Sequence, residues 1–173
     1  FADVDQFLHT EYDATTTQAF IEGGYAFARN AWAVEPYLQL ARVDVDTDAF
    51  TEEGGNVALS GAAAETRATL STVGLRFDVN LSGAQPAASG LHLRGGLGYR
   101  HASGDLVAEG VHAWDGGQAF TVTGAPLAEN STVAEAGIAA RLGGRSLLEF
   151  NYSGQYGDEA RDHGASVRYS LAF

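Results

Sequence analysis

The side chains that could do chemistry in this sequence are histidines and carboxylates. The 5 histidines do not stand at metal-ligand spacings, and the sequence holds neither a nucleophile elbow nor a phosphate-binding loop. Asp44, Asp46 and Asp48 alternate at the end of a strand pattern and could gather a divalent ion, although acids in such a place are more typical of a solvated loop. The sequence therefore predicts no catalytic residue, no cofactor and no metal site, and we expect a protein that is not an enzyme.

A second set of charged residues is more regular, because each member lies on the polar side of an expected strand. The set consists of five acids and five arginines, namely Glu22, Glu35, Asp78, Glu135 and Glu149 with Arg76, Arg94, Arg100, Arg141 and Arg168. A dry core could not bury ten charges, since each would cost several kcal/mol of desolvation. A water-filled interior could hold them as ion pairs, and so could the solvated outside of a soluble β-sandwich.

Alternation of apolar and polar residues with a period of two predicts the strands that carry these charges. We expect seven strands, over 16–28, 32–46, 67–81, 90–102, 131–142, 146–158 and 161–173. In the second strand Pro36 removes one backbone donor, which weakens the prediction there. The connections alternate between short ones (29–31, 82–89, 143–145) and long loops (47–65, 103–129), with one short alternating piece at 119–123.

Composition narrows the class of protein. There is no run of about 18 apolar residues, which excludes a transmembrane helix. The net charge of −12 argues against a nucleic-acid partner, and the absence of Cys fits a chain that crosses an oxidising compartment. With 22 Gly, 7 Tyr and 9 Phe but 3 Pro, the chain has the composition of an all-β protein. It begins at Phe1 without a visible signal peptide, so we expect a piece of something longer.

Two features favour a membrane barrel over a soluble sandwich. Alternating short turns and long loops are typical of outer-membrane barrels. The chain also ends on an amphipathic strand, whose apolar side holds Tyr169, Leu171 and Phe173. We therefore predict an antiparallel transmembrane β-barrel of the bacterial outer membrane. Its outer face would contact membrane lipid and lipopolysaccharide, and the ten charged residues would face its lumen.

Six short phrases resemble the translocator (β) domain of monomeric bacterial autotransporters, in that family's order and spacing. They are 20–25 (FIEGGY), 35–40 (EPYLQL), 98–101 (GYRH), 120–126 (FTVTGAP), 135–137 (EAG) and 152–158 (YSGQYGD). The resemblance covers about residues 10–173 and implies a barrel that supports export of an N-terminal passenger to the cell surface by type V secretion. It also implies that the barrel-assembly machinery recognises the last strand through Tyr169, Leu171 and Phe173.

The resemblance also implies twelve strands and a helix in the lumen. We expect seven strands and no helix here, so residues 1–173 would be the C-terminal portion of one barrel domain. Its partners would then include the missing N-terminal strands, the plug helix and the passenger, because unpaired strand edges are costly in lipid.

Two other functions stay open at this point. The chain could be a small structural or adhesive outer-membrane barrel. Less favoured is a barrel-embedded autoprotease with Glu22, Glu35 and Asp78 as its acidic groups, since no motif specific to that chemistry occurs.

Overall fold

The computed structural model describes residues 7–55, 57–82, 90–142, 145–158 and 160–172. Within these ranges the chain forms twelve β-strands, and the pairings between them are antiparallel. No helix long and apolar enough to cross a membrane occurs among the described residues. The predicted all-β, antiparallel fold is therefore confirmed.

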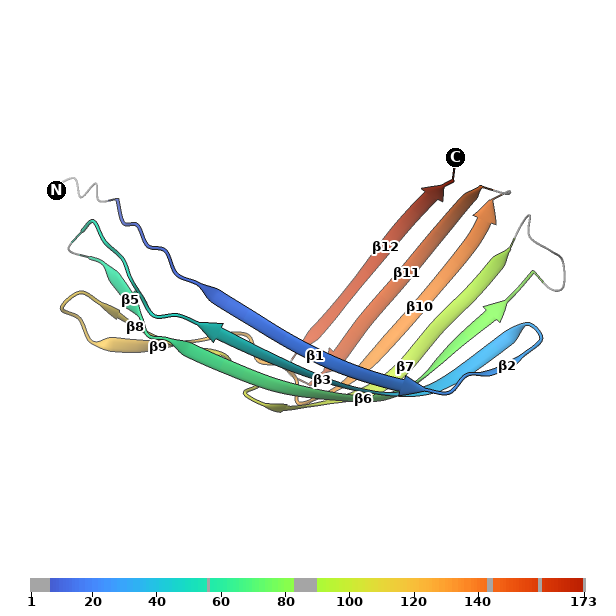
Figure 1. Ribbon diagram of the computed structural model, residues 1–173, viewed down its shortest axis with the longest axis horizontal. Coiled ribbons are helices and arrows are strands. Elements are labelled where there is room, and N and C mark those ends of the chain that lie inside the picture. Colours follow the sequence, from blue (N-terminus) through green and yellow to red (C-terminus); the bar gives the residue numbers. More distant parts are fainter. Residues whose placement is uncertain (1–6, 56, 83–89, 143–144, 159, 173) are drawn as a thin grey trace. The chain divides into compact units, whose positions relative to one another are not determined.

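The larger sheet has the strand order β1-β3-β6-β7-β10-β11-β12, with β2 paired to β3 (Figure 1). Its strands are β1 (Ala14–Gly24), β2 (Phe27–Arg29), β3 (Trp32–Thr47), β6 (Ala64–Asn80), β7 (Leu91–Gly104), β10 (Asn130–Leu142), β11 (Ser146–Gly157) and β12 (Arg161–Leu171). Strands β1 and β12 stand at the two ends of this order. Each of the seven strands expected from the sequence is found at its place.

One expected strand, 16–28, is not continuous in the structure. The first strand is interrupted between β1 and β2, where the backbone N–H of Tyr25 donates to the carbonyl oxygen of Pro36 at 3.2 Å. Pro36 has no N–H with which to return the second bond, so the ladder breaks there. The last strand begins at Arg161, as expected from the sequence, and Arg161 and Asp162 pair with Tyr156 and Gln155.

The register of β7, β10, β11 and β12 gives the sheet two different faces. Leu93, Ile138, Phe150 and Val167 are successive partners across these four strands and form one apolar row. The next row consists of Arg94, Gly137, Asn151 and Ser166. Side chains of adjacent rows point to opposite faces, so one face is apolar and the other is polar.

The apolar face is exposed rather than packed in a core. Val167 is 70 % exposed, Leu97 62 % and Phe20 72 %, whereas the buried apolar residues are alanines: Ala68, Ala102, Ala128 and Ala139. Exposed apolar surface of this kind marks a face that meets another apolar phase or a partner.

The chain divides into two compact units. The strand unit consists of Phe20–Ala41, Leu70–Ala102 and Ala128–Phe173, and the loop unit of Phe1–Ala19, Arg42–Thr69 and Ser103–Leu127.

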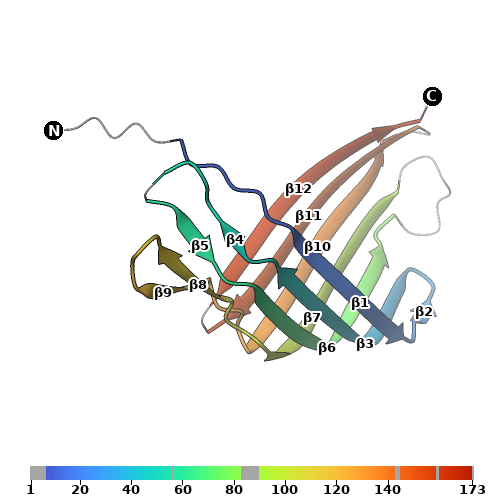
Figure 2. The ribbon, with the colours of Figure 1, turned by 60° about the vertical axis from the view of Figure 1, so that its left-hand side comes forward.

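The loop unit contains a second sheet with the order β4-β5-β8-β9 (Figure 2). Its strands are β4 (Phe50–Thr51), β5 (Leu59–Gly61), β8 (Glu109–Trp114) and β9 (Ala119–Thr123). The alternating piece predicted at 119–123 is confirmed as β9. The prediction of loops over 47–65 and 103–129 is otherwise wrong. Strands β4 and β5, of two and three residues, are too short to show alternation; β4 pairs with β5, and β5 pairs with β8.

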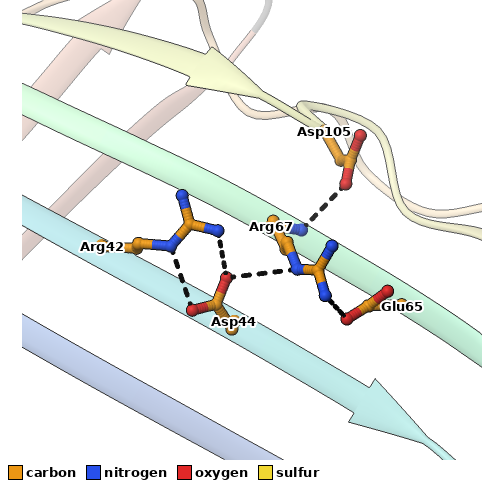
Figure 3. Close-up of polar contacts among 5 residues, drawn as sticks. All are labelled: Arg42, Asp44, Glu65, Arg67 and Asp105. Carbon is orange, nitrogen blue, oxygen red and sulfur yellow. Dashed lines mark hydrogen bonds and ion pairs between the residues drawn. The ribbon is translucent and has the colours of Figure 1, made fainter.

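A group of ion pairs joins the ends of the long strands in the loop unit (Figure 3). Arg42 holds Asp44 with two nitrogens, at 3.1 and 2.9 Å, and Arg67 approaches the same carboxylate at 3.7 Å. Arg67 also pairs with Glu65. Its backbone N–H donates to the Asp105 carboxylate at 2.9 Å, and its carbonyl oxygen accepts from the Asp105 N–H at 2.7 Å. Asp105 therefore fixes the position at which the backbone leaves β7.

Gly104, the residue before Asp105, makes this exit possible. Its φ is +105°, a conformation that L side chains rarely adopt, and a methyl group there would overlap the carbonyl oxygen of Arg67. Glycine is thus required at this position.

We expect Gly104→Ala to lower the free energy of unfolding by about 1–2 kcal/mol, because the alanine would be strained and would weaken the Asp105 contacts. Urea unfolding of the full-length protein in lipid vesicles measures the change. Gly23→Ala is the control, since nothing lies within 4 Å of a methyl group there. Equal stability of the two variants would contradict the prediction.

Candidate functional site

The charged face of the larger sheet is the side that carries the ten charged residues singled out from the sequence. Register places Arg94 and Arg100 on the same face as Glu135 and Arg141 of β10, and continues through Asn151 to Arg168 of β12. The remaining members are tied to this face by contacts within the strand unit, described next. The strand register therefore places six of the ten on one face: Arg94, Arg100, Glu135, Arg141, Glu149 and Arg168.

Arg76 of β6 is the centre of the best-connected group. Its guanidinium binds the Glu22 carboxylate with two nitrogens, at 2.5 and 2.8 Å, and approaches Glu35 at 3.7 Å. The amide of Gln39 donates to the same Glu22 carboxylate at 3.1 Å. The guanidinium carbon also lies 3.8 Å from the centre of the Tyr37 ring. Side chains from β1, β3 and β6 are thereby joined across the charged face.

Tyr37 of β3 fits beside Arg76 because β6 and β7, the next two strands of the sheet, have glycines under its ring. A methyl group at Gly74 would lie 2.6 Å from the Tyr37 ring, and one at Gly98 would lie 2.9 Å from its hydroxyl. The space left by these glycines allows the ring to lie flat against β6 and β7.

Two smaller groups lie along the same face. Asp78 is 3.7 Å from Arg94 and 3.4 Å from His92.

Arg100 has neutral partners instead, donating to Thr72 at 3.2 Å and to Gln155 of β11 at 2.9 Å. Of the three acids named as autoprotease candidates, Glu22 and Glu35 lie against Arg76, and Asp78 lies against Arg94 and His92.

Five of the ten residues form no ion pair within the described part of the chain: Arg100, Glu135, Arg141, Glu149 and Arg168. Four of the five are on β10, β11 and β12, and Arg100 is on β7. Glu149 and Arg168 are nevertheless direct cross-strand partners. The ion pairs of the charged face are thus concentrated on its N-terminal strands.

Two cavities open on the strand unit beside these groups. The larger, of about 380 Å³, is lined by Glu35, Arg76, Asp78, Arg94 and Glu135 among others. The second, of about 280 Å³, is lined by Gln39, Arg100, Gln155 and Asp162 among others. No cluster of three or more potential metal ligands occurs in the part of the chain that the structure describes.

The residues expected to act as an assembly signal lie on β12. Tyr169 and Leu171 are 60 % and 55 % exposed and continue the apolar side of Val167. The Tyr169 hydroxyl lies 3.1 Å from the hydroxyl of Ser146. Phe173, the third member, lies outside the described residues.

Sequence reasoning missed the neutral members of the polar groups. Tyr37, Gln39, Thr72 and Gln155 share the strand parity of the charged residues, so alternation did place them on that face. Their roles depend on which strands are neighbours, and alternation does not give that information.

Comparison with known proteins identifies the family. The model of the autotransporter β-domain matches residues 1–153. The chain belongs to the autotransporter β-domain family. Autotransporter β-domains are translocators in the bacterial outer membrane and support export of a passenger by type V secretion.

Two curated relatives from Serratia marcescens, both named extracellular serine protease, are 30 % and 29 % identical to this chain over 164 and 163 residues. Each match covers 94 % of this chain but 15 % of the relative. The chain thus spans a small part of the length of the curated relatives it matches. No solved structure matches it.

We expect the Glu22–Arg76 pair to stabilise the autotransporter β-domain by about 0.5–1 kcal/mol, because both side chains are partly exposed and water screens the attraction. A double-mutant cycle of Glu22→Gln and Arg76→Gln, followed by urea unfolding in lipid vesicles, measures this coupling. The Asp78–Arg94 pair is the matched comparison and should couple more weakly, since its atoms are 3.7 Å apart. Stronger coupling in that second pair would contradict the prediction.

Proposed function

We propose that residues 1–173 are the C-terminal portion of a translocator barrel whose ten charged residues face the lumen. The two-faced sheet carries this proposal, since one face exposes large apolar side chains and the other bears ion pairs. Such a sheet suits a wall with lipid on one side and water on the other.

Further strands of the same polypeptide complete this barrel in our proposal. Support comes from β1 and β12, which stand at the ends of the strand order, and from relatives that are much longer than this chain. Open edges in lipid would leave backbone groups unsatisfied at several kcal/mol each, so closure is physically required.

In this proposal the lumen is a polar passage whose wall is cross-linked by ion pairs on some strands and carries charges on others that are unpaired among the described residues. The Arg76 group ties β1, β3 and β6 together, while Glu135, Arg141, Glu149 and Arg168 hold their charges towards the lumen water. These four are available to the plug helix or to a passenger in transit. Glu22, Glu35 and Asp78 brace the wall through their arginines and take no catalytic part.

The protease activity in the relatives' name belongs to those proteins. We infer that, if the full protein has an activity of that kind, it lies in the passenger. Lipopolysaccharide and other outer-membrane lipids contact the apolar face, and the barrel-assembly machinery binds β12 during insertion.

Surface display tests the proposed function. The full-length gene is expressed in a Gram-negative host with an epitope tag in the passenger, and intact cells are probed with antibody and external protease. We expect tag accessibility that is lost when residues 1–173 are deleted. A tag that stays on the surface after this deletion, or never reaches it with the intact gene, would rule the function out.

We expect Phe173→Ala to reduce the amount of folded barrel in the outer membrane, because the closing strand loses the aromatic end that the assembly machinery recognises. The measurement is the fraction of protein whose gel mobility changes on heating. Ser170→Ala is the control, since residue 170 lies on the other side of β12 from Tyr169 and Leu171. Wild-type amounts of folded Phe173→Ala barrel would contradict the assembly signal.

A further inference from the structure

One face of the small sheet in the loop unit carries a row of aromatic rings. Phe50, Gly61, His112 and Phe120 are successive partners across β4, β5, β8 and β9, so they form one transverse row. Phe50 reaches across Gly61, where a methyl group would overlap its ring, and its ring centre lies 6.0 Å from that of His112. The His112 ring centre is in turn 5.9 Å from that of Phe120. The glycine thus allows the row to be continuous.

Two further rings extend this row at its ends. Tyr12 stacks on Phe50 with ring centres 5.2 Å apart, and Trp114 stacks on Phe120 at 6.4 Å. Tyr12, Trp114 and Phe120 are 55 %, 50 % and 38 % exposed. Five aromatic rings therefore form an aromatic row (Tyr12, Phe50, His112, Phe120, Trp114), which crosses the small sheet and ends at Tyr12, outside its strands.

The same sheet ends at a strand edge. The N–H of Gly124 donates to the carbonyl oxygen of Ala108 at 2.7 Å, so the even-numbered residues of β9 bond to β8. The backbone groups of its odd-numbered residues, Ala119, Thr121 and Thr123, point to the other side. No strand pairs there in the described part of the chain, and every residue of β9 is exposed. Such an edge is a template for adding a strand.

The net charge of the loop unit indicates which kind of added strand would bind at the edge of β9. Residues 7–19, 42–69 and 103–127 contain 11 Asp and Glu but 2 Arg, and both arginines are held by Asp44 and Glu65. The loop unit that holds the aromatic row therefore carries a strongly negative net charge. Aromatic faces attract guanidinium and ammonium groups, and a negative surround adds to this attraction.

We propose that the loop unit binds an extended, basic polypeptide segment, which adds as a strand to the edge of β9 and places arginine or lysine side chains on the aromatic row. Backbone hydrogen bonds to Ala119, Thr121 and Thr123 supply the register. Phe120 and Trp114, nearest the edge, receive the cationic side chains. This inference goes beyond translocation and rests on the loop unit alone.

The test uses the full-length protein in detergent and a fluorescent nine-residue peptide of alternating Arg and Thr, with binding followed by anisotropy. A peptide of alternating Glu and Thr and the neutral glycan maltoheptaose are the alternative occupants. We expect the Arg-Thr peptide to bind, with an affinity that falls as salt is raised. Equal or tighter binding of either alternative would overturn the proposal.

Two variants separate strand addition from general attraction to an acidic surface. Thr121→Pro removes an outward N–H at an edge position where proline is tolerated, and Phe120→Thr removes a ring while keeping a strand-forming residue. Each should weaken peptide binding about fivefold, which corresponds to about 1 kcal/mol. Val111→Thr, an exposed change on the opposite face of β8, is the matched control and should bind as the wild type does.

The same variants are assayed for surface display of the tagged passenger, so that failure of this inference is separable from failure of the proposed function. Normal display together with weaker peptide binding in Thr121→Pro and Phe120→Thr supports the inference. Wild-type peptide affinity in both variants overturns it, whatever the display assay shows.

Discussion

The strand register is the constraint on which the rest of the larger sheet depends. From β7 to β12 the partners run without interruption, so that Leu93 meets Ile138, Phe150 and Val167 in one row. A slip of one residue in any pair would exchange the faces and place charges such as Arg168 among the apolar side chains. The cost of a charge in lipid makes that slip prohibitive. The apolar face and the charged face therefore have the same cause, which is the register of the hydrogen bonds between strands.

The ion pairs of the charged face are unevenly distributed along the sheet. On the N-terminal strands Arg76 gathers two glutamates, a glutamine and a tyrosine, which gives these strands a cross-braced surface. On β10 to β12 the charged residues have no ion pair among the described residues, although Glu149 and Arg168 are direct neighbours. In the proposed barrel, the paired residues would hold the wall in shape, and the charged residues without ion pairs among those described would keep the passage polar. The glycines beside Tyr37 show how closely the braced part is packed.

The extent to which the sequence predicts this protein differs between the two units. Long strands are predictable from the sequence, since apolar and polar residues alternate over many positions, as in the strand that contains Val73 to Phe77. All seven predicted strands are present in the structure. Strands β4 and β5, of two and three residues, have no such signal; they depend on long-range pairing, β4 with β5 and β5 with β8. In the same way alternation gave the face of Arg100 but not its partners Thr72 and Gln155, which come from β6 and β11.

The sequence by itself determined which residues share a face, because the side-chain period of a strand is a local property of the backbone. It also determined the family, through short phrases in a fixed order. Only the tertiary structure decided which charges meet, that Arg76 binds Glu22 while Arg168 binds no acid among the described residues, and that five aromatic residues distant in sequence form one row. These contacts depend on strand order and on space left by glycines, and both are fixed only when the strands pair.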